Sequence, residues 1–251
     1  MKRVIEKIDI DKIDVEVMKY KREKYEFKMP RGMMEGLRLY KHQKSGVEFL
    51  LNQRRAVLGM AVGLGKTLTA ITAGKELLNR KKVERILVIS PVNVKYNWKE
   101  EIEKFGNEKV AVLNSGDLRK TAEDYWEDAE NSTFIVVNFD MIRKQEDARR
   151  LQKLCPDAVI VDEAHKLKNS SSQQTKAFKK FWKDAEYIWL LTATPFPNAQ
   201  PKETYTMLNH INPGITGTWR EFGKNFVVFE EVFTPYGIKQ VPVRLKNTDK
   251  L

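Results

Sequence analysis

Short apolar runs alternate with longer amphipathic stretches along most of this chain. The short runs have the length and β-branched content of strands, whereas the stretches between them repeat their apolar residues with helical spacing. Strands that alternate with helices predict βαβ units and an α/β fold, with a mainly parallel sheet flanked by helices. We expect strands at 56–61, 85–90, 109–113, 133–139, 157–161 and 186–191, and helices at 42–53, 66–80, 94–105, 117–129, 139–154 and 172–183.

Composition limits the class of protein more than its function. With 41% apolar and 31% charged residues, the chain is globular rather than disordered. Its net charge of +11 suits a polyanionic partner, although charge alone does not identify nucleic acid. One cysteine, Cys155, cannot form an internal disulfide, and no run is long enough to span a membrane or serve as a signal peptide. We expect an intracellular protein, cytoplasmic in a prokaryote or virus and nuclear in a eukaryote.

A glycine-rich string lies between the apolar run 56–61 and the following helical stretch. Glycines allow the backbone to turn with its N–H groups facing inward, and the start of a helix adds a positive dipole end. Lys66 would reach the β- and γ-phosphates of a nucleotide, and the Thr67 hydroxyl would bind Mg²⁺. The full pattern has glycine at position 60, where this chain has Met60, and a ligand-free turn is the alternative. The predicted phosphate-binding residues are Gly63, Leu64, Gly65, Lys66 and Thr67.

An acidic pair follows the apolar run 158–161. Open α/β sheets bind ligands at the carboxyl ends of their strands, which is where Asp162 falls. This carboxylate can hold the Mg²⁺ of Mg-ATP, and Glu163 can polarise the attacking water. The alternative is an ordinary acidic strand end with a solvated His165. Combined with the glycine-rich string, the pair predicts an ATP-hydrolysis site that uses ATP and Mg²⁺, with Lys66, Asp162 and Glu163 as its catalytic residues.

Several strings match one family at matching intervals across residues 37–225. Together they resemble the motifs of Swi/Snf-type DNA-dependent ATPases, which belong to superfamily two of the helicases. The strings are LYKHQKSGVEFL at 39–50, ILVISPVNVKYNW at 86–98, DEAHKLKN at 162–169, LLTATPFPN at 190–198 and LNHINP at 208–213.

This resemblance implies the first of two RecA-like P-loop NTPase lobes with ATP bound between them. Gln43 would read the adenine edge, and Thr192 and Thr194 would couple the state of the phosphates to the DNA-facing loops. Contacts with the DNA backbone would position the protein without reading sequence. Those contacts are implied for Pro91, Asn93, Asn138 and Lys168. Trp98 is expected in the core rather than facing DNA.

The chain also departs from the family pattern. An acidic pair is usual at positions 60 and 61, where this chain has Met60 and Ala61. Ala193 replaces a common glycine, and Asn93 stands where serine is frequent. The backbone amides and Lys66 remain, so these changes leave phosphate binding in place.

Three segments are expected: an N-terminal preface at 1–36, the first RecA-like ATP-binding domain at 37–225, and an extension at 226–251 toward a second lobe. Residues 244–251 are predicted to begin a further helix. Nothing after Pro213 resembles the second lobe, which in the family supplies an arginine finger. We therefore expect one lobe of a longer motor, or half of a split one.

The function expected is that of an ATP hydrolase lobe that translocates on double-stranded DNA and is nearly inactive without its second lobe. Its expected partners are DNA and a second lobe in cis or in trans, and no membrane. Two alternatives stay open at this point. One is a lobe of another superfamily-two helicase or of a restriction-type translocase, and the other is a nucleotide-responsive DNA-binding module that does not hydrolyse ATP.

Overall fold

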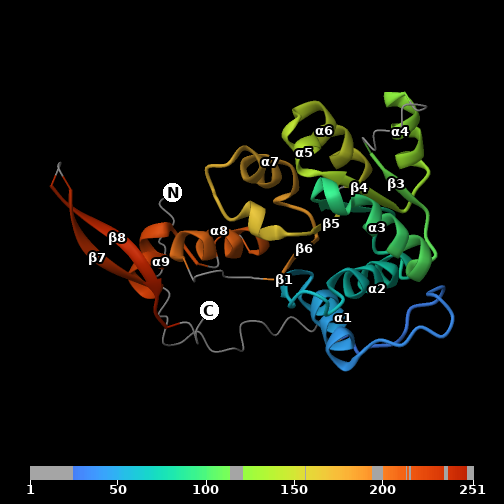
Figure 1. Cartoon of the computed structure of the whole chain (residues 1–251), viewed down its shortest axis with the longest axis horizontal. Coiled ribbons are helices and arrows are strands. Elements are labelled where there is room, and N and C mark those ends of the chain that lie inside the picture. Colours follow the sequence, from blue (N-terminus) through green and yellow to red (C-terminus); the bar gives the residue numbers. More distant parts are fainter. Residues whose placement is uncertain are drawn as a thin grey trace, which may run out of the picture.

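The computed structural model describes residues 25–113, 121–155, 157–193, 200–212, 214, 216–234 and 237–247. At its centre lies a six-stranded sheet in the order β1-β6-β5-β2-β4-β3, in which every neighbouring pair is parallel (Figure 1). The predicted α/β fold with a parallel sheet is therefore confirmed. The strands are β1 (Arg55–Gly59), β2 (Ile86–Ser90), β3 (Val110–Val112), β4 (Phe134–Asn138), β5 (Ala158–Val161) and β6 (Tyr187–Thr192).

Helices lie between these strands, close to where the sequence predicts them. They are α1 (Lys41–Gln53), α2 (Lys66–Asn79), α3 (Lys95–Glu101), α4 (Ala122–Glu130), α5 (Phe139–Arg143), α6 (Gln145–Leu154) and α7 (Gln173–Trp182). Two short 3₁₀ helices, η3 (Val92–Val94) and η5 (Ala164–Leu167), and a short π-helix, η4 (Ile102–Gly106), complete the connections. The helix predicted at 139–154 is two helices, because Lys144 adopts an extended conformation with ψ 114° between α5 and α6.

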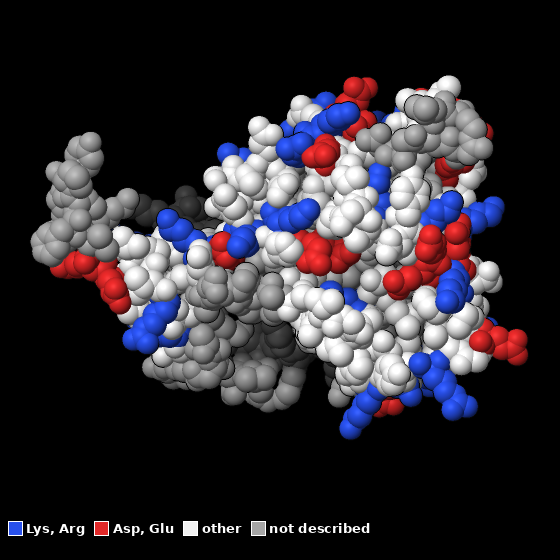
Figure 2. All heavy atoms as spheres, in the orientation of Figure 1, with Lys and Arg blue, Asp and Glu red and all other residues white. Residues whose placement is uncertain are grey.

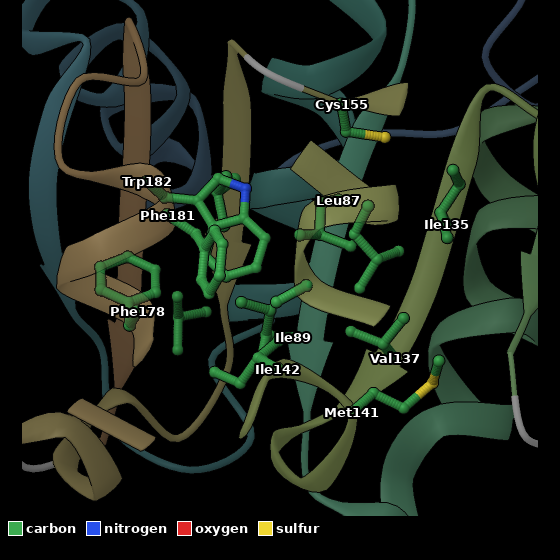
Figure 3. Close-up of a cluster of buried hydrophobic side chains, with 14 of the residues drawn as sticks. Leu87, Ile89, Ile135, Val137, Met141, Ile142, Cys155, Phe178, Phe181 and Trp182 are labelled. Atoms are coloured by element: carbon green, nitrogen blue, oxygen red, sulfur yellow. The ribbon is translucent and has the colours of Figure 1, made fainter. Parts of the chain in front are cut away.

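Two hydrophobic clusters cover the two faces of the sheet, so the domain has three layers. One cluster joins the strands to α1, α2 and α3 through residues such as Leu50, Ile71 and Trp98. The other joins them to α4, α5, α6 and α7, and Figure 3 shows its centre, where Phe178 and Trp182 lie beside the strand residues. The central strands β2, β4, β5 and β6 are buried along their whole length, which explains their continuous apolar runs.

The chain beyond β6 forms two helices and a hairpin that project from one side of the sheet (Figure 1). These are α8 (Pro201–Ile211), α9 (Trp219–Phe226) and the antiparallel pair β7 (Val227–Thr234) and β8 (Gly237–Leu245). The helix predicted at 244–251 is wrong where the structure describes it, because Arg244 and Leu245 belong to β8. Val241, Val243 and Leu245 alternate with polar or proline residues, which is the two-residue period of a strand.

None of the helices in the described ranges is long and apolar enough to cross a membrane. A turn follows Pro30 and includes Gly32, and residues 1–24 of the predicted preface lie outside the described residues.

We expect folding stability to fall between pH 6.5 and pH 4 because of His210. Burial lowers the pKa of this imidazole from 6.5 to about 4, and its Nε2 lies 3.2 Å from the Leu167 carbonyl oxygen. The unfolded chain takes up a proton in that range whereas the folded chain does not, which costs about 3 kcal/mol in total. Urea unfolding across the range should show a shallower pH dependence in His210→Gln than in the wild type. Equal slopes in the two proteins would contradict the assignment.

Candidate nucleotide site

The predicted catalytic residues lie at the carboxyl ends of neighbouring strands. The glycine-rich loop follows β1 and Asp162 follows β5, with β6 between them in the sheet. Gly59 of β1 pairs in register with Thr192 of β6, and the Met60 N–H donates to the Thr192 carbonyl at 3.2 Å. Buried Thr192 therefore lies directly beside the start of the loop. Thr194 lies outside the described residues.

The loop has the backbone that its glycines predict. Gly63 and Gly65 adopt φ values of +81° and +80°, which other residues rarely adopt, and α2 begins directly afterwards at Lys66. A Cβ on Gly65 would lie only 2.3 Å from the Gln43 side-chain nitrogen, so a larger residue would displace Gln43 in addition to straining the backbone. The Lys66 ammonium donates to the Met60 carbonyl at 2.9 Å and lies 3.5 Å from the Ala61 carbonyl. The Lys66 side chain therefore folds back against the loop that is predicted to bind phosphate.

Gln43, which lies in α1, contacts the glycine-rich loop through its side chain. Its side-chain oxygen accepts from the Tyr40 N–H at 2.9 Å, and its side-chain nitrogen donates to the Leu64 carbonyl at 3.3 Å. The His42 ring nitrogen Nε2 lies 3.1 Å from the same carbonyl. Gln43 is buried, and both ends of its amide have partners in this conformation. Its contact with adenine stays a prediction. A pocket of about 810 Å³ opens next to it between α1 and the end of β1, lined by residues that include Phe49, Met60 and Leu64.

Asp162 is held by two hydrogen bonds from different elements. One carboxylate oxygen accepts from the Trp98 indole N–H at 2.9 Å, and the other accepts from the Glu163 backbone N–H at 2.9 Å. Burial raises the pKa of Asp162, while these hydrogen bonds and the charge of Lys66 lower it. Lys66 and Asp162 follow β1 and β5, which both flank β6, so the two residues lie at the same edge of the sheet.

Glu163 lies at the turn after β5 with φ +49°, a strained value for a residue with a side chain. Its carboxylate lies 3.0 Å from Nδ1 of His165, and both side chains are partly exposed. The turn directs Glu163 away from the course of the strand and pairs it with His165. Asp162 and Glu163 are therefore two half-buried acids adjacent in sequence, of which the first accepts from Trp98 and the second lies beside His165.

The donor set fits Mg²⁺ bound together with phosphates. Thr69 and Thr72 of α2 donate their hydroxyls to carbonyls one turn back, whereas the Thr67 hydroxyl has no protein partner among the described residues. Those residues contain no cluster of three or more His, Cys, Asp or Glu side chains suited to a metal. Mg²⁺ commonly uses one or two protein oxygens and takes its other ligands from substrate phosphates and water. Thr67 and Asp162 could supply such a pair of oxygens, and their binding of Mg²⁺ stays a prediction.

The residues implied in DNA contact have different surroundings. Asn93 is exposed in η3, whereas Pro91, two residues earlier, is buried. Asn138 is also buried, and its side-chain oxygen accepts from the Met141 N–H at 3.0 Å to cap α5. Lys168 forms an ion pair with Glu203 at 3.0 Å. Figure 2 shows basic and acidic side chains interspersed on the face it presents, rather than one continuous basic surface. The DNA contacts stay predictions. Of the four residues, Asn93 is the one whose exposure best suits contact with DNA.

Two residues near the acid were not singled out for the site by the sequence. Trp98 is buried in the core as predicted, and its bond to Asp162 was not foreseen. Glu101 lies one turn further along α3; burial, followed by the nearby charge of Asp162, raises its pKa. Trp98 and Glu101 are three residues apart and therefore lie on the same side of a helix. This spacing is the sequence signal that could have identified both residues.

The parallel sheet, the glycine loop leading into α2 and the acid after β5 define a P-loop nucleotide-binding fold of the RecA-like kind. The profile of the SNF2-related domain matches residues 42–245, and the chain belongs to this family. The Swi/Snf resemblance is thereby confirmed.

Among curated proteins, the chain is 30% identical over 236 residues to the Transcriptional regulator ATRX homolog of Caenorhabditis elegans, covering 74% of this chain and 17% of that protein. It is 33% identical over 189 residues to the Chromodomain-helicase-DNA-binding protein 1-like of Mus musculus, covering 72% and 20%. It is 29% identical over 207 residues to the DNA repair and recombination protein RAD54-like of Gallus gallus, covering 74% and 28%. The chain thus spans between 17% and 28% of the length of these relatives.

Two solved structures share the fold. The Sulfolobus solfataricus SWI2/SNF2 ATPase core domain matches with a TM-score of 0.60 and 26% identity, covering 82% of this chain and 39% of that one. The same core in complex with double-stranded DNA matches with a TM-score of 0.64 and 23% identity, covering 80% and 41%.

Proposed function

We propose that this chain is the ATP-binding N-terminal lobe of a Swi/Snf-type ATPase that hydrolyses ATP and moves along double-stranded DNA. The observation that carries the proposal is that the glycine loop with Lys66 follows β1 and that Asp162 follows β5, at the carboxyl ends of two strands that flank β6. In P-loop NTPases a loop lysine contacts the β- and γ-phosphates, and an acid together with the loop Ser or Thr holds Mg²⁺. The family membership supports the same function.

Each residue of the site then has a role. The backbone N–H groups of the loop from Gly63 to Gly65 would bind the phosphate oxygens, and Lys66 would leave the carbonyls it now contacts to pair with the outer phosphates. Thr67 and Asp162 would hold Mg²⁺, which when bound neutralises charge on the phosphates. Glu163 would orient and polarise the attacking water.

The DNA and the second lobe belong to the proposal too. One related structure is an ATPase core in complex with double-stranded DNA, which supports DNA as the partner here. The family's arginine finger would come from a second lobe, in cis or in trans. We place the domain at 37–225, and the hairpin of β7 and β8 within the extension at 226–251.

The isolated chain should bind ATP weakly and hydrolyse it very slowly, because an arginine finger contributes about 10³–10⁵ in rate. Hydrolysis would be measured with and without duplex DNA, first for residues 1–251 alone and then with a second lobe from a relative supplied in trans or fused in cis. We expect DNA-stimulated turnover only in the second case. Robust DNA-stimulated turnover by the chain alone would contradict the proposal, as would the absence of any nucleotide binding.

A further inference from the structure

Trp98 makes a hydrogen bond that sets it apart from other buried tryptophans of this chain. It is 1% exposed, and its indole N–H donates to Oδ2 of Asp162 at 2.9 Å. Trp182 and Trp189 are equally buried, yet their indole nitrogens have no partner among the described residues. An indole N–H can only donate, so its natural partner in a core is an acceptor such as this carboxylate. Two other buried indoles therefore have no hydrogen-bond partner among the described residues, whereas the Trp98 indole bonds to Asp162.

The two hydrogen bonds to Asp162 fix the plane of its carboxylate. Oδ2 accepts from α3 through Trp98, and Oδ1 accepts from the turn through the Glu163 N–H. Each oxygen keeps a lone pair for a further ligand. Partners of this kind, which orient a metal-binding side chain without touching the metal, typically change metal affinity about 10- to 100-fold when they are removed.

The helix that carries Trp98 follows directly from the segment implied in DNA contact. Val92 is 59% exposed and Tyr96 is 47% exposed, and Asn93 is exposed between them. Trp98 lies on the opposite, buried side of the same short segment. A ligand that shifts the exposed side would shift the indole donor with it.

We propose that Trp98 is a positioning residue that orients Asp162 for the Mg²⁺-bound nucleotide and links this acid to the exposed segment 92–97. The proposal rests on the function proposed above. It goes further, because it assigns to a core tryptophan a specific effect on metal-dependent binding.

The test compares Trp98→Phe with Trp189→Phe. Both changes remove an indole from the same hydrophobic cluster, but only the first removes a hydrogen bond. Binding of a fluorescent ATP analogue would be measured with Mg²⁺ and in EDTA. We expect Trp98→Phe to weaken binding about tenfold with Mg²⁺ and to leave binding in EDTA unchanged. Trp189→Phe should change neither. Equal behaviour of the two variants would overturn the inference, whereas a wild-type protein that gains nothing from Mg²⁺ would count against the proposed function instead.

A second measurement covers the case in which Trp98→Phe does not fold. In the wild-type protein, the Trp98 indole N–H signal should shift in nuclear magnetic resonance spectra when Mg²⁺ and nucleotide are added together. The signals of Trp182 and Trp189 should not move. A Trp98 signal that also stays in place would overturn the positioning role.

Duplex DNA tests the link to the exposed segment. DNA should change the Mg²⁺-dependent affinity for the nucleotide in the wild-type protein and have less effect in Trp98→Phe. A DNA effect of equal size in both proteins, or none in the wild type, would overturn the link.

Discussion

Replacing Lys66 with alanine should weaken nucleotide binding by about 10- to 100-fold, because hydrogen bonds to charged groups contribute about 1.5–3 kcal/mol and each 1.4 kcal/mol is tenfold. The ammonium already lies in the loop, 2.9 Å from the Met60 carbonyl, and would need only a side-chain movement to reach a phosphate. Binding of a fluorescent ATP analogue measures the change directly. DNA binding should be unaffected, since Lys66 lies at the start of α2 and not on the exposed segment 92–97.

Lys82→Ala is the matched control for this prediction. Lys82 is exposed beyond the far end of α2, so its replacement removes the same charge without touching the loop. Nucleotide binding by Lys82→Ala should equal that of the wild type. If Lys66→Ala bound nucleotide as tightly as this control, the glycine loop would be an ordinary turn and the site would lie elsewhere.

Much of the fold could be predicted because the sheet is parallel and buried. β4 and β5 read as continuous apolar runs, since both of their faces are covered by helices. The break at Lys144 could not be predicted, because the helical sequence pattern runs through the residue whose extended backbone separates α5 from α6. The hairpin of β7 and β8 was not predicted because it lies apart from the parallel sheet. The alternation of strands with helices, on which the other strands were predicted, does not extend to it.

The backbone of the candidate site was predictable where it depends on local sequence. The loop needs glycines at positions 63 and 65 for their positive φ values, and the acid needs a strand end. The bond from Trp98 to Asp162 joins residues 64 positions apart, so it depends on how α3 packs on the sheet. The sequence around a tryptophan at a core position of a helix does not identify the acceptor to which its indole N–H will donate. For that reason the sequence predicted the core position of Trp98 but not its hydrogen bond to Asp162.

Replacing Glu163 with glutamine should separate chemistry from binding. If Glu163 polarises the attacking water, its loss should slow hydrolysis by about 10²–10⁴-fold, the usual contribution of a general base. The change removes a charge without shortening the side chain, and it leaves the Glu163 N–H that holds Asp162 in place. Affinity for the Mg²⁺-bound nucleotide should therefore stay at the wild-type value, unlike that of Lys66→Ala. Single-turnover assays with protein in excess can follow even a slow basal rate.

Two further variants make this test specific to the side chain. Glu100→Gln removes an exposed glutamate from α3 and should hydrolyse at the wild-type rate. His165→Ala removes the partner that lies 3.0 Å from the Glu163 carboxylate and should slow hydrolysis less than Glu163→Gln, because the base itself remains. A Glu163→Gln rate equal to that of Glu100→Gln would assign the water to another group. Such a result would leave Asp162 as a metal-binding acid and would favour a nucleotide-binding lobe whose catalytic base lies outside the turn after β5.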